Sequence, residues 1–328
     1  MPHILDGPHI LDGKVVLLTG GTGSFGQMFL AEALRSSTCV VRVFSRDEHK
    51  QAEVREAYGA DRVRYLIGDV RDRERLTRAA RGADIIVHAA AMKQVPACEY
   101  NPFEAVQTNV IGAENVVSSA IDANVERVVA LSTDKAVNPV NVYGATKLCA
   151  EKIVVQGNAY AGGKPTRLCC VRYGNVVGSR GSVVPLFLRQ RELGELTITD
   201  DRMTRFWMTL NESVQLVLHA IEHGRGGEVF VPRISSMRVV DLAEAIAPGL
   251  PTRVIGIRPG EKIHELLITS DESRHTVQYD HMYVVLPEHQ WWLGEGCDDG
   301  RPVEDGFVFS SATNDHFLGV EDLRAMLG

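Results

Sequence analysis

Short apolar runs alternate with longer amphipathic segments through the first half of the chain. Continuous apolar runs of this length are typical of strands that a parallel sheet buries on both faces. They predict strands at Lys14 to Thr19, Val40 to Phe44, Val63 to Ile67, Asp84 to Ala89 and Arg127 to Ser132. The segments between them predict helices at Phe25 to Leu34, Glu48 to Tyr58, Arg73 to Arg81 and Pro102 to Asn124. This alternation predicts an α/β fold built on a Rossmann-type, doubly wound parallel sheet.

The pattern becomes less regular after Gly178. It predicts helices at Val183 to Leu193 and Glu212 to His223, and short strands at Leu196 to Thr199 and Glu228 to Val231. Beyond Met237, helices mix with loops rich in proline and glycine. We expect a Rossmann domain of residues 14–180 and about 208–236. A smaller α+β substrate lobe would take residues from about 181–207 and 237–328.

The first residues form a tandem repeat, because the hexamer PHILDG occurs at 2–7 and again at 8–13. A duplicated hexamer just before the first strand suggests a tag or an artefactual leader. Residues 1–13 are therefore left out of the predicted fold.

Composition narrows the classes of partner. The net charge of −7 lacks the basic excess that nucleic acids or anionic membranes favour. No apolar run is long enough to cross a bilayer, and the N-terminus lacks a secretory signal. The six cysteines show no C-x-x-C spacing, so we expect reduced thiols in a cytoplasmic protein and no metal.

A glycine-rich loop follows the first predicted strand and leads into a helix, in the sequence TGGTGSFG. Glycines there permit a tight turn and let backbone N–H groups approach a pyrophosphate, and the helix N-terminus favours negative charge. This context predicts a dinucleotide site and not a plain structural turn, although the spacing differs from Gly-x-Gly-x-x-Gly. The expected contacts are Gly20, Thr22, Gly23, Ser24, Phe25 and Gly26.

The residues after the second strand bear on the choice between NADP and NAD. An acidic residue directly there would bind the ribose hydroxyl and repel a 2′-phosphate. Ser45, Arg46 and Lys50 stand there instead and can bind a phosphate, although Asp47 follows closely. We favour NADP over NAD, against the alternative of a solvated loop of mixed charge. Asp69, after the third strand, is placed to meet the adenine edge.

The spacing Tyr-x-x-x-Lys occurs twice, at Tyr143/Lys147 and at Tyr160/Lys164. In a helix the first pair shares one face, where the ammonium would lower the pKa of the phenol and let it exchange protons with a hydroxyl. The second pair contains two glycines and precedes Pro165, which argues against a helix.

Thr133, Asp134 and Lys135 follow the strand that ends at Ser132. Polar groups at the carboxyl end of a parallel strand lie where α/β sheets bind ligands. Adjacent strand residues point to opposite faces, so Asp134 and Lys135 can serve one site only if the chain is already turning. Without the neighbouring tyrosine and lysine, an inconsequential surface pair would be the better interpretation.

Several segments together carry a family resemblance. They are TGGTGSFG, FSRDEHKQ, GDVRD, HAAAMKQVPACEYNPFEAVQTNVIGAENV, LSTDKAVNPVNVYGATKLCAEK, RYGNVVGSRGSVVPLF, MTRFW, RPGEKIHE and SSATNDHFLGVEDLR. From Lys14 to the C-terminus the chain resembles extended short-chain dehydrogenase/reductases. Among these it looks most like the inverting UDP-N-acetylglucosamine 4,6-dehydratases of the pseudaminic acid pathway. Related retaining enzymes typically have methionine at the position of Tyr143, so the resemblance implies inversion.

The resemblance also implies a mechanism. Tyr143, supported by Lys147, would take the C4 hydroxyl proton while hydride passes to NADP⁺. Lys135 would remove the C5 proton as a neutral amine, and Asp134 in its acid form would protonate the departing C6 oxygen. Hydride return to C6 and protonation of C5 from the opposite face would give UDP-2-acetamido-2,6-dideoxy-β-L-arabino-hex-4-ulose. These roles require burial to neutralise Asp134 and Lys135, or a pair that shares one proton.

Further contacts are implied in the same way. The expected additional cofactor contacts are Val70, Ala89, Ala90, Lys93, Asn109, Tyr143, Lys147 and Tyr173. The expected substrate contacts are Lys93, Thr133, Asn175, Val183, Arg205, Arg258 and Glu261, with a structural salt bridge left open for Arg205. His264-Glu265 lacks the second histidine of a zinc-protease helix, and neither it nor Trp291-Trp292 receives a role.

The implied partner is UDP-N-acetylglucosamine, and the implied assembly is a homo-oligomer, either a dimer or a hexamer. The competing interpretations are a retaining dehydratase or a 4-epimerase on the same scaffold and, more distantly, a non-catalytic NADP-sensing protein. A 4-epimerase needs the tyrosine and lysine but has no use for the Asp134-Lys135 pair.

Overall fold

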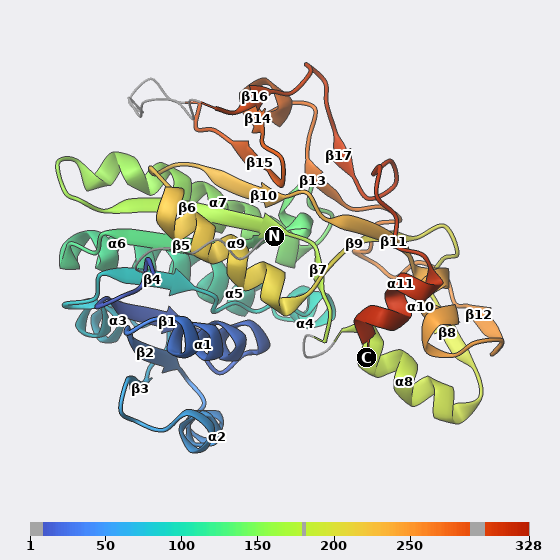
Figure 1. Cartoon of the computed structure of the whole chain (residues 1–328), viewed down its shortest axis with the longest axis horizontal. Coiled ribbons are helices and arrows are strands. Elements are labelled where there is room, and N and C mark those ends of the chain that lie inside the picture. Colours follow the sequence, from blue (N-terminus) through green and yellow to red (C-terminus); the bar gives the residue numbers. More distant parts are fainter. Residues whose placement is uncertain (1–8, 179–181, 289–298, 328) are drawn as a thin grey trace.

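The computed structural model describes residues 9–178, 182–288 and 299–327, and a ten-stranded sheet forms its centre (Figure 1). The strand order is β16-β14-β15-β10-β6-β5-β4-β1-β2-β3. The parallel strands are β1 (Val15–Thr19), β2 (Val40–Ser45), β3 (Val63–Ile67), β4 (Ile85–His88), β5 (Arg127–Thr133), β6 (Arg167–Tyr173) and β10 (Val229–Pro232). The predicted doubly wound sheet is confirmed, and its strand order reverses between β1 and β4, where such sheets bind ligands.

Helices cover both faces of this sheet and create two cores. One face is covered by α1 (Ser24–Ser36), α2 (Glu48–Tyr58) and α9 (Leu210–His223). The other is covered by α3 (Arg73–Ala80), α6 (Gly112–Ala123) and α7 (Val142–Ala161). In β1, Leu17 faces the second core while Val16 and Leu18 face the first, and all three are fully buried. A continuous apolar strand therefore supplies both layers.

The predicted helix from Pro102 to Asn124 is divided into three parts. These are α5 (Pro102–Ala105), the π-helical turn η1 (Val106–Ile111) and α6. A short helix, α4 (Val95–Tyr100), precedes them and was not predicted. Single π-helical turns within α-helices often occur at functional sites, and η1 carries Asn109.

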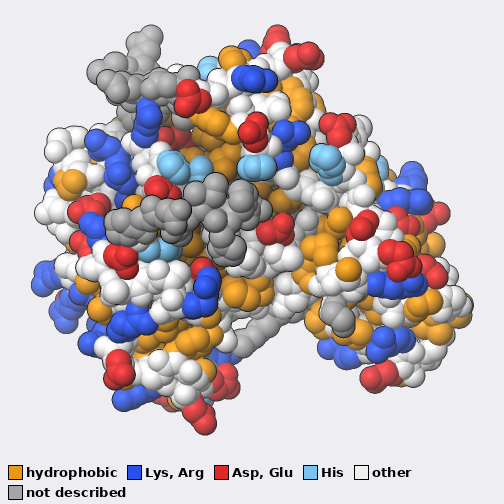
Figure 2. Space-filling model, viewed as in Figure 1, with side chains coloured by type: hydrophobic (Ala, Val, Ile, Leu, Met, Phe, Trp, Pro, Cys, Tyr) orange, Lys and Arg blue, Asp and Glu red, His pale blue; other side chains and the backbone are white. Residues whose placement is uncertain are grey.

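The smaller lobe has its own core and stands apart from the main domain, with a notch between them on the face seen in Figure 2. Its helices are α8 (Val183–Leu193), α10 (Val239–Ile246) and α11 (Val320–Leu327). Its strands are β7 (Asn175–Val176), β8 (Leu196–Ile198), β9 (Thr204–Met208), β11 (Ser235–Arg238) and β12 (Thr252–Val254). A further pair, β13 (Leu266–Ile268) with β17 (Phe309–Ser310), contacts the main domain at η2 (Asp134–Ala136), the 3₁₀ turn after β5. A second 3₁₀ turn, η3 (Glu272–His275), follows β13 and packs against the edge of the main sheet.

Two predicted boundaries need correction. The main sheet is extended by β14 (Thr276–Gln278), β15 (Met282–Val285) and β16 (Arg301–Pro302). Strand β15 pairs antiparallel with β10, β14 pairs with β15, and β16 pairs with β14, so these strands do not belong to a separate substrate lobe. Residues 9–13 take part in the fold, although they were left out of it. Leu11 is fully buried, and Asp12 accepts a hydrogen bond from the Thr38 N–H at 2.8 Å.

Within the described part of the chain, no helix has the length and apolar character needed to cross a membrane. Five cysteines in these residues are free thiols, and no cluster there has the side chains to hold a metal ion. Cys297 and Trp291-Trp292 lie outside the described residues.

Candidate active site

The end of β5 turns sharply and brings three polar side chains together. Thr133 is the last residue of β5, and its hydroxyl accepts a hydrogen bond from the Lys135 N–H at 3.3 Å, which caps η2. The same hydroxyl donates to Asp134 Oδ1 at 2.9 Å. Lys135 Nζ donates to that oxygen at 3.0 Å. The chain thus turns at the point where it must if Asp134 and Lys135 are to serve one site.

Helix α7 places Tyr143 and Lys147 beside this turn. Asn141 caps the helix by accepting the Gly144 N–H at 2.7 Å, and the side chains of Tyr143 and Lys147 are both buried. Lys147 Nζ donates to the carbonyl oxygen of Leu131 in β5 at 2.6 Å, which ties the helix to the catalytic strand. The other Tyr-x-x-x-Lys pair does not share a helix, because α7 ends at Ala161.

Asn109 connects the helix to the loop after β4. Its Nδ2 donates to Thr146 Oγ1 at 3.0 Å and to the Met92 carbonyl oxygen at 2.9 Å, and its Oδ1 accepts the Met92 N–H at 2.8 Å. The loop therefore presents Lys93 from a fixed backbone. Partial burial and the nearby Lys135 lower the pKa of Lys93.

The electrostatics of Tyr143 differ from the expectation. Burial raises the pKa of Tyr143 to about 12, while Lys135 and a side-chain hydrogen bond with Thr133 act to lower it. Lys147, the predicted cation for the phenol, donates its Nζ to the Leu131 carbonyl oxygen. Burial also lowers the pKa of Lys147. Lys135 is a cation that acts to lower the pKa of Tyr143.

The surroundings of Lys135 favour its ammonium form, so the predicted roles need the second arrangement, in which Lys135 and Asp134 share one proton. Burial acts to lower the pKa of Lys135, but the carboxylates of Asp134 and Glu265 outweigh burial and raise it. Glu265 Oε1 lies 3.5 Å from Lys135 Nζ, and Glu265 is only 3% exposed. The structure therefore holds Lys135 as an ammonium.

Sequence reasoning missed Glu265. Its carboxylate reaches Lys135 through a contact across 130 positions of sequence, and no spacing rule links the two. The only available signal was its position in RPGEKIHE, directly before the apolar strand β13.

The glycine loop between β1 and α1 has the backbone geometry of a dinucleotide cradle. Gly20 has φ +70°, and a Cβ there would lie 2.8 Å from Ala90 N and 2.9 Å from the carbonyl carbon of Ala89. A Cβ on Gly26 would lie 2.5 Å from Gly21 Cα. Gly23 caps α1 without a side-chain hydrogen bond. Side chains at Gly20 and Gly26 would overlap the neighbouring backbone, so glycine is required for the tight turn from β1 into α1, and this turn fits a pyrophosphate bound at the helix N-terminus.

The residues after β2 and β3, where the adenosine contacts were predicted, interact with one another. Arg46 Nη1 is 3.6 Å from Asp69 Oδ2, and the Arg46 side chain remains more than half exposed. Asp47 caps α2 by accepting the Lys50 N–H at 3.0 Å, and its other oxygen is 2.9 Å from Lys50 Nζ. Asp47, the acidic residue that weighed against NADP, thus interacts with the first turn of α2. Ser45 Oγ accepts from Gln51 Nε2 at 3.0 Å.

Two other predicted cofactor contacts lie near the sheet, where Val70 is buried and Tyr173 is partly buried. Val70 is buried, and its carbonyl oxygen accepts from Asn115 Nδ2 at 2.9 Å. Tyr173 ends β6, and burial raises the pKa of its phenol.

The predicted substrate residues differ in whether protein groups already bind their polar atoms. Asn175 lies on β7, and its Oδ1 is buried with no hydrogen-bond partner within the described residues, while Val183 begins α8. Arg205, by contrast, donates to the carbonyl oxygens of Ile263 (2.9 Å) and Lys262 (3.0 Å). Arg205 Nε also lies 4.0 Å from Glu265 Oε1, and the predicted contact of Arg205 with substrate stays a prediction.

Arg258 and Glu261 form an exposed pair 3.8 Å apart. Asn141 Nδ2 donates to the Gly260 carbonyl oxygen at 2.7 Å, which fixes this segment against the start of α7. Gly260, which lies between Arg258 and Glu261, is thereby bound to the residue that caps α7.

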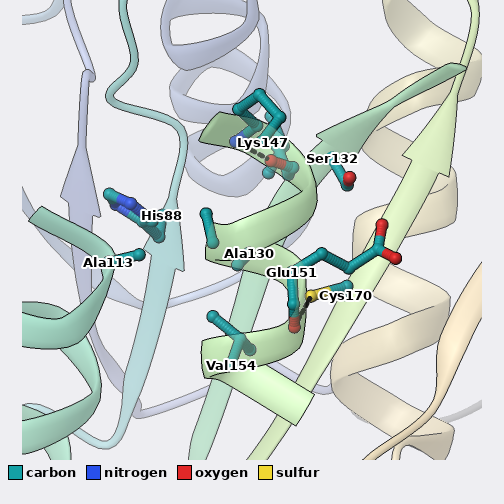
Figure 3. Close-up of a pocket in the computed structure, with 10 residues that line it drawn as sticks. His88, Ala113, Ala130, Ser132, Lys147, Glu151, Val154 and Cys170 are labelled. Atoms are coloured by element: carbon teal, nitrogen blue, oxygen red, sulfur yellow. Dashed lines mark hydrogen bonds between the residues drawn. The ribbon is translucent and has the colours of Figure 1, made fainter. Parts of the chain in front are cut away.

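A small cavity lies between α7 and the sheet, as Figure 3 shows. Lys147 of α7 lines it and donates to the Leu131 carbonyl oxygen of β5. His88 also lines this cavity, and its Nδ1 lies 2.8 Å from Thr19 Oγ1. Burial, and secondarily Lys147, lowers the pKa of His88 to about 3. This histidine is therefore neutral near physiological pH.

A doubly wound sheet, a glycine cradle at its switch point and a Tyr-x-x-x-Lys helix beside it define an enzyme of the extended short-chain dehydrogenase/reductase class. The chain belongs to the family described as "Polysaccharide biosynthesis protein", whose model matches residues 16–287. The predicted family resemblance is confirmed by a relative, "UDP-N-acetylglucosamine 4,6-dehydratase (inverting)" of Campylobacter jejuni. It is 46% identical over 324 residues, which cover 96% of this chain and 97% of the relative.

Two other matches place the chain among related proteins. A "UDP-glucose 4-epimerase" of Rickettsia akari is 47% identical over 268 residues, or 79% of each chain. The X-ray structure of Pen from Bacillus thuringiensis superposes with a TM-score of 0.90 at 39% identity and covers 97% of this chain and 98% of its own.

Proposed function

We propose that this protein is a UDP-N-acetylglucosamine 4,6-dehydratase that inverts C5 and yields UDP-2-acetamido-2,6-dideoxy-β-L-arabino-hex-4-ulose. The observation that carries the proposal is the hydrogen bond between Lys135 Nζ and Asp134 Oδ1, at 3.0 Å, beside Tyr143. Eliminating water across C5 and C6 needs a base for carbon and an acid for oxygen. A 4-epimerase needs neither, so this pair favours the dehydratase.

The first step is oxidation at C4. Tyr143 takes the proton of the C4 hydroxyl as a phenolate, the form that Lys135 and the Thr133 hydrogen bond favour against the effect of burial. Bound NADP supplies the hydride acceptor for C4 and the hydride that C6 later receives. The resulting 4-keto group acidifies the C5 proton.

The Lys135-Asp134 hydrogen bond resolves the awkward protonation states. Transfer of one proton from Lys135 Nζ to Asp134 Oδ1 creates an amine and a carboxylic acid together, without exchange with solvent. Lys135 then takes the C5 proton and Asp134 gives its proton to the C6 oxygen, which leaves as water. The pair returns to the ammonium–carboxylate state of the structure. A solvent-derived proton then reaches C5 from the opposite face and inverts that centre, while the proton that Tyr143 took from the C4 hydroxyl returns to solvent, so the protons balance.

NADP is the proposed cofactor, in preference to NAD. The exposed Arg46 side chain supports this choice, since guanidinium groups bind phosphate well. The local engagement of Asp47 supports it too, because that carboxylate caps α2 and pairs with Lys50. We further propose a homo-oligomer, either a dimer or a hexamer. The side chains of Tyr100 and Phe103, 88% and 83% exposed, support a protein interface on α4 and α5.

The test is incubation with UDP-N-acetylglucosamine in D₂O, followed by NMR over time. A 4-keto-6-deoxy product of L-arabino configuration with deuterium at C5 is expected. A product that keeps the D-xylo configuration throughout would overturn inversion, and UDP-N-acetylgalactosamine would identify the 4-epimerase instead. Lys135→Ala is expected to abolish elimination and retain NADP binding. Lys152→Ala, an exposed lysine on α7, is the matched control.

A further inference from the structure

Glu265 is a buried carboxylate to which the proposed mechanism gives no task. It directly precedes β13, and its backbone is fixed from both sides: its N–H donates to Ser311 Oγ and its carbonyl oxygen accepts the Ser311 N–H, both at 2.9 Å. Its side chain is therefore presented from a rigid position. Burying a carboxylate is unfavourable unless other charges compensate for it.

Three cations surround the Glu265 carboxylate. Lys135 Nζ lies 3.5 Å from Oε1, Arg205 Nε lies 4.0 Å from Oε1, and Lys262 Nζ lies 3.6 Å from Oε2. Oε2 is buried without a hydrogen-bond partner within the described residues. The carboxylate thus acts on its neighbours mainly through charge.

Two of these cations are committed elsewhere. Lys262 Nζ donates to the Val137 carbonyl oxygen at 2.6 Å, and Arg205 is bound to the carbonyl oxygens of residues 262 and 263. Lys135 differs, since Asp134 is the only hydrogen-bond partner of its Nζ within the described residues, and its side chain is 24% exposed. Lys135 is therefore the cation whose position and protonation Glu265 can alter.

The charges that face Lys135 come from every neighbouring element. Asp134 lies on the same turn, Glu265 and Arg205 approach from the lobe side, Tyr143 lies on α7, and Lys93 lies after β4. In the proposed proton cycle, Asp134 changes charge whenever Lys135 does. Glu265 takes no proton in that cycle and so supplies a constant negative charge.

We propose that Glu265 is a positioning residue, which anchors Lys135 Nζ beside Asp134 and sets the pH range in which Lys135 exchanges its proton. This inference rests on the proposed function for its kinetic consequence. Its electrostatic part concerns Lys135 alone and can be tested whatever product the enzyme forms.

The electrostatic test uses the full chain with NADP, labelled with [¹³Cε]lysine and titrated by NMR. Lys135→Met identifies the Lys135 signal. In Glu265→Gln the midpoint of that signal should fall by about one to three pH units relative to wild type, as expected on losing an opposite charge at this distance. Glu265→Asp keeps the charge and should shift the midpoint less. Glu228→Gln, which removes a buried carboxylate that binds backbone N–H groups elsewhere, should not shift it.

An unchanged midpoint in Glu265→Gln would overturn the proposal. If that variant does not fold, Glu265→Asp decides. Its shorter side chain moves the charge away from Lys135 Nζ, so a lower midpoint is expected, and a midpoint equal to wild type would also overturn the proposal.

The kinetic test follows deuterium incorporation at C5. Glu265→Gln should lower kcat about 10- to 100-fold, because a misplaced catalytic group costs this much, with little change in KM. The pH optimum should move to lower pH. Equal losses in Glu228→Gln, or a parallel loss of thermal stability with no pH shift, would indicate a merely structural role and overturn the inference. If wild type forms only the 4-epimer, the proposed function fails, while the Lys135 titration still decides the role of Glu265.

Discussion

The backbone of Gly144 lies directly against the carbonyl oxygen of Lys135, so that a Cβ at residue 144 would overlap with that oxygen. The contact joins the first turn of α7 to η2. It sets the separation between Tyr143, on one side, and the Asp134-Lys135 pair, on the other. Glycine is therefore required here by close approach and not by an unusual backbone angle.

Gly144→Ala should push the start of α7 away from η2. We expect a loss of stability of about 1–3 kcal/mol, typical of overpacking, and a fall in kcat larger than this loss explains. Chemical denaturation and product formation measure the two effects. Gly163→Ala is the control, since a Cβ there meets nothing within 4 Å. Equal behaviour of the two variants would show that the contact is unimportant.

Tyr143→Phe removes the hydroxyl that is proposed to take the C4 proton. We expect kcat to fall about 10²- to 10⁴-fold, as for the loss of a general acid or base. Tyr160→Phe is the matched control, because Tyr160 begins the same sequence spacing but its side chain is exposed at the end of α7. The measurement is the appearance of the 4-keto product. Retention of activity in Tyr143→Phe would remove the tyrosine from the mechanism.

The sequence was sufficient for features that depend on local pattern. The strands β1 to β5 are short, mainly apolar runs, and α2 has the predicted bounds Glu48–Tyr58. The glycine loop follows from the first of these strands. Each of these needs only neighbouring residues to be recognised.

The sequence was insufficient where distant segments meet. The contact of Glu265 with Lys135 depends on the packing of the lobe against β5, and the strands β14 to β16 are too short and mixed in composition to show a period. The hexamers at 2–7 and 8–13 are identical in sequence, so the repeat gives no sign that Leu11 is fully buried in the fold. Likewise, the pKa of Tyr143 follows from burial, which spacing alone does not reveal.

The stability of the protein should depend on His88 under mildly acidic conditions. Its pKa is lowered to about 3 in the folded state by burial, so the unfolded state binds a proton first as the pH falls. The stabilisation is fully present above the ordinary histidine pKa and is lost between about pH 6.5 and 3, at about 1.4 kcal/mol per unit at most.

His88→Asn should flatten this part of the stability curve, measured by urea denaturation at several pH values. His49→Asn is the control, because the His49 side chain is 89% exposed and its variant should keep the wild-type slope. A wild-type slope in His88→Asn would mean that other groups cause the acid dependence.

Arg46 should determine the preference for NADP. Its guanidinium is exposed at the end of β2, where the acidic neighbour Asp47 is engaged in capping α2, so a 2′-phosphate there would meet positive charge. Arg46→Ala should weaken NADP binding about 10- to 100-fold, equivalent to one lost charge-assisted hydrogen bond, and leave NAD binding unchanged. Calorimetric titration with each dinucleotide measures both. Arg55→Ala, which removes an exposed arginine from α2, should alter neither. If Arg46→Ala binds NADP as tightly as wild type does, the preference lies elsewhere; if it weakens both dinucleotides equally, Arg46 binds the shared part of the cofactor and not its 2′-phosphate.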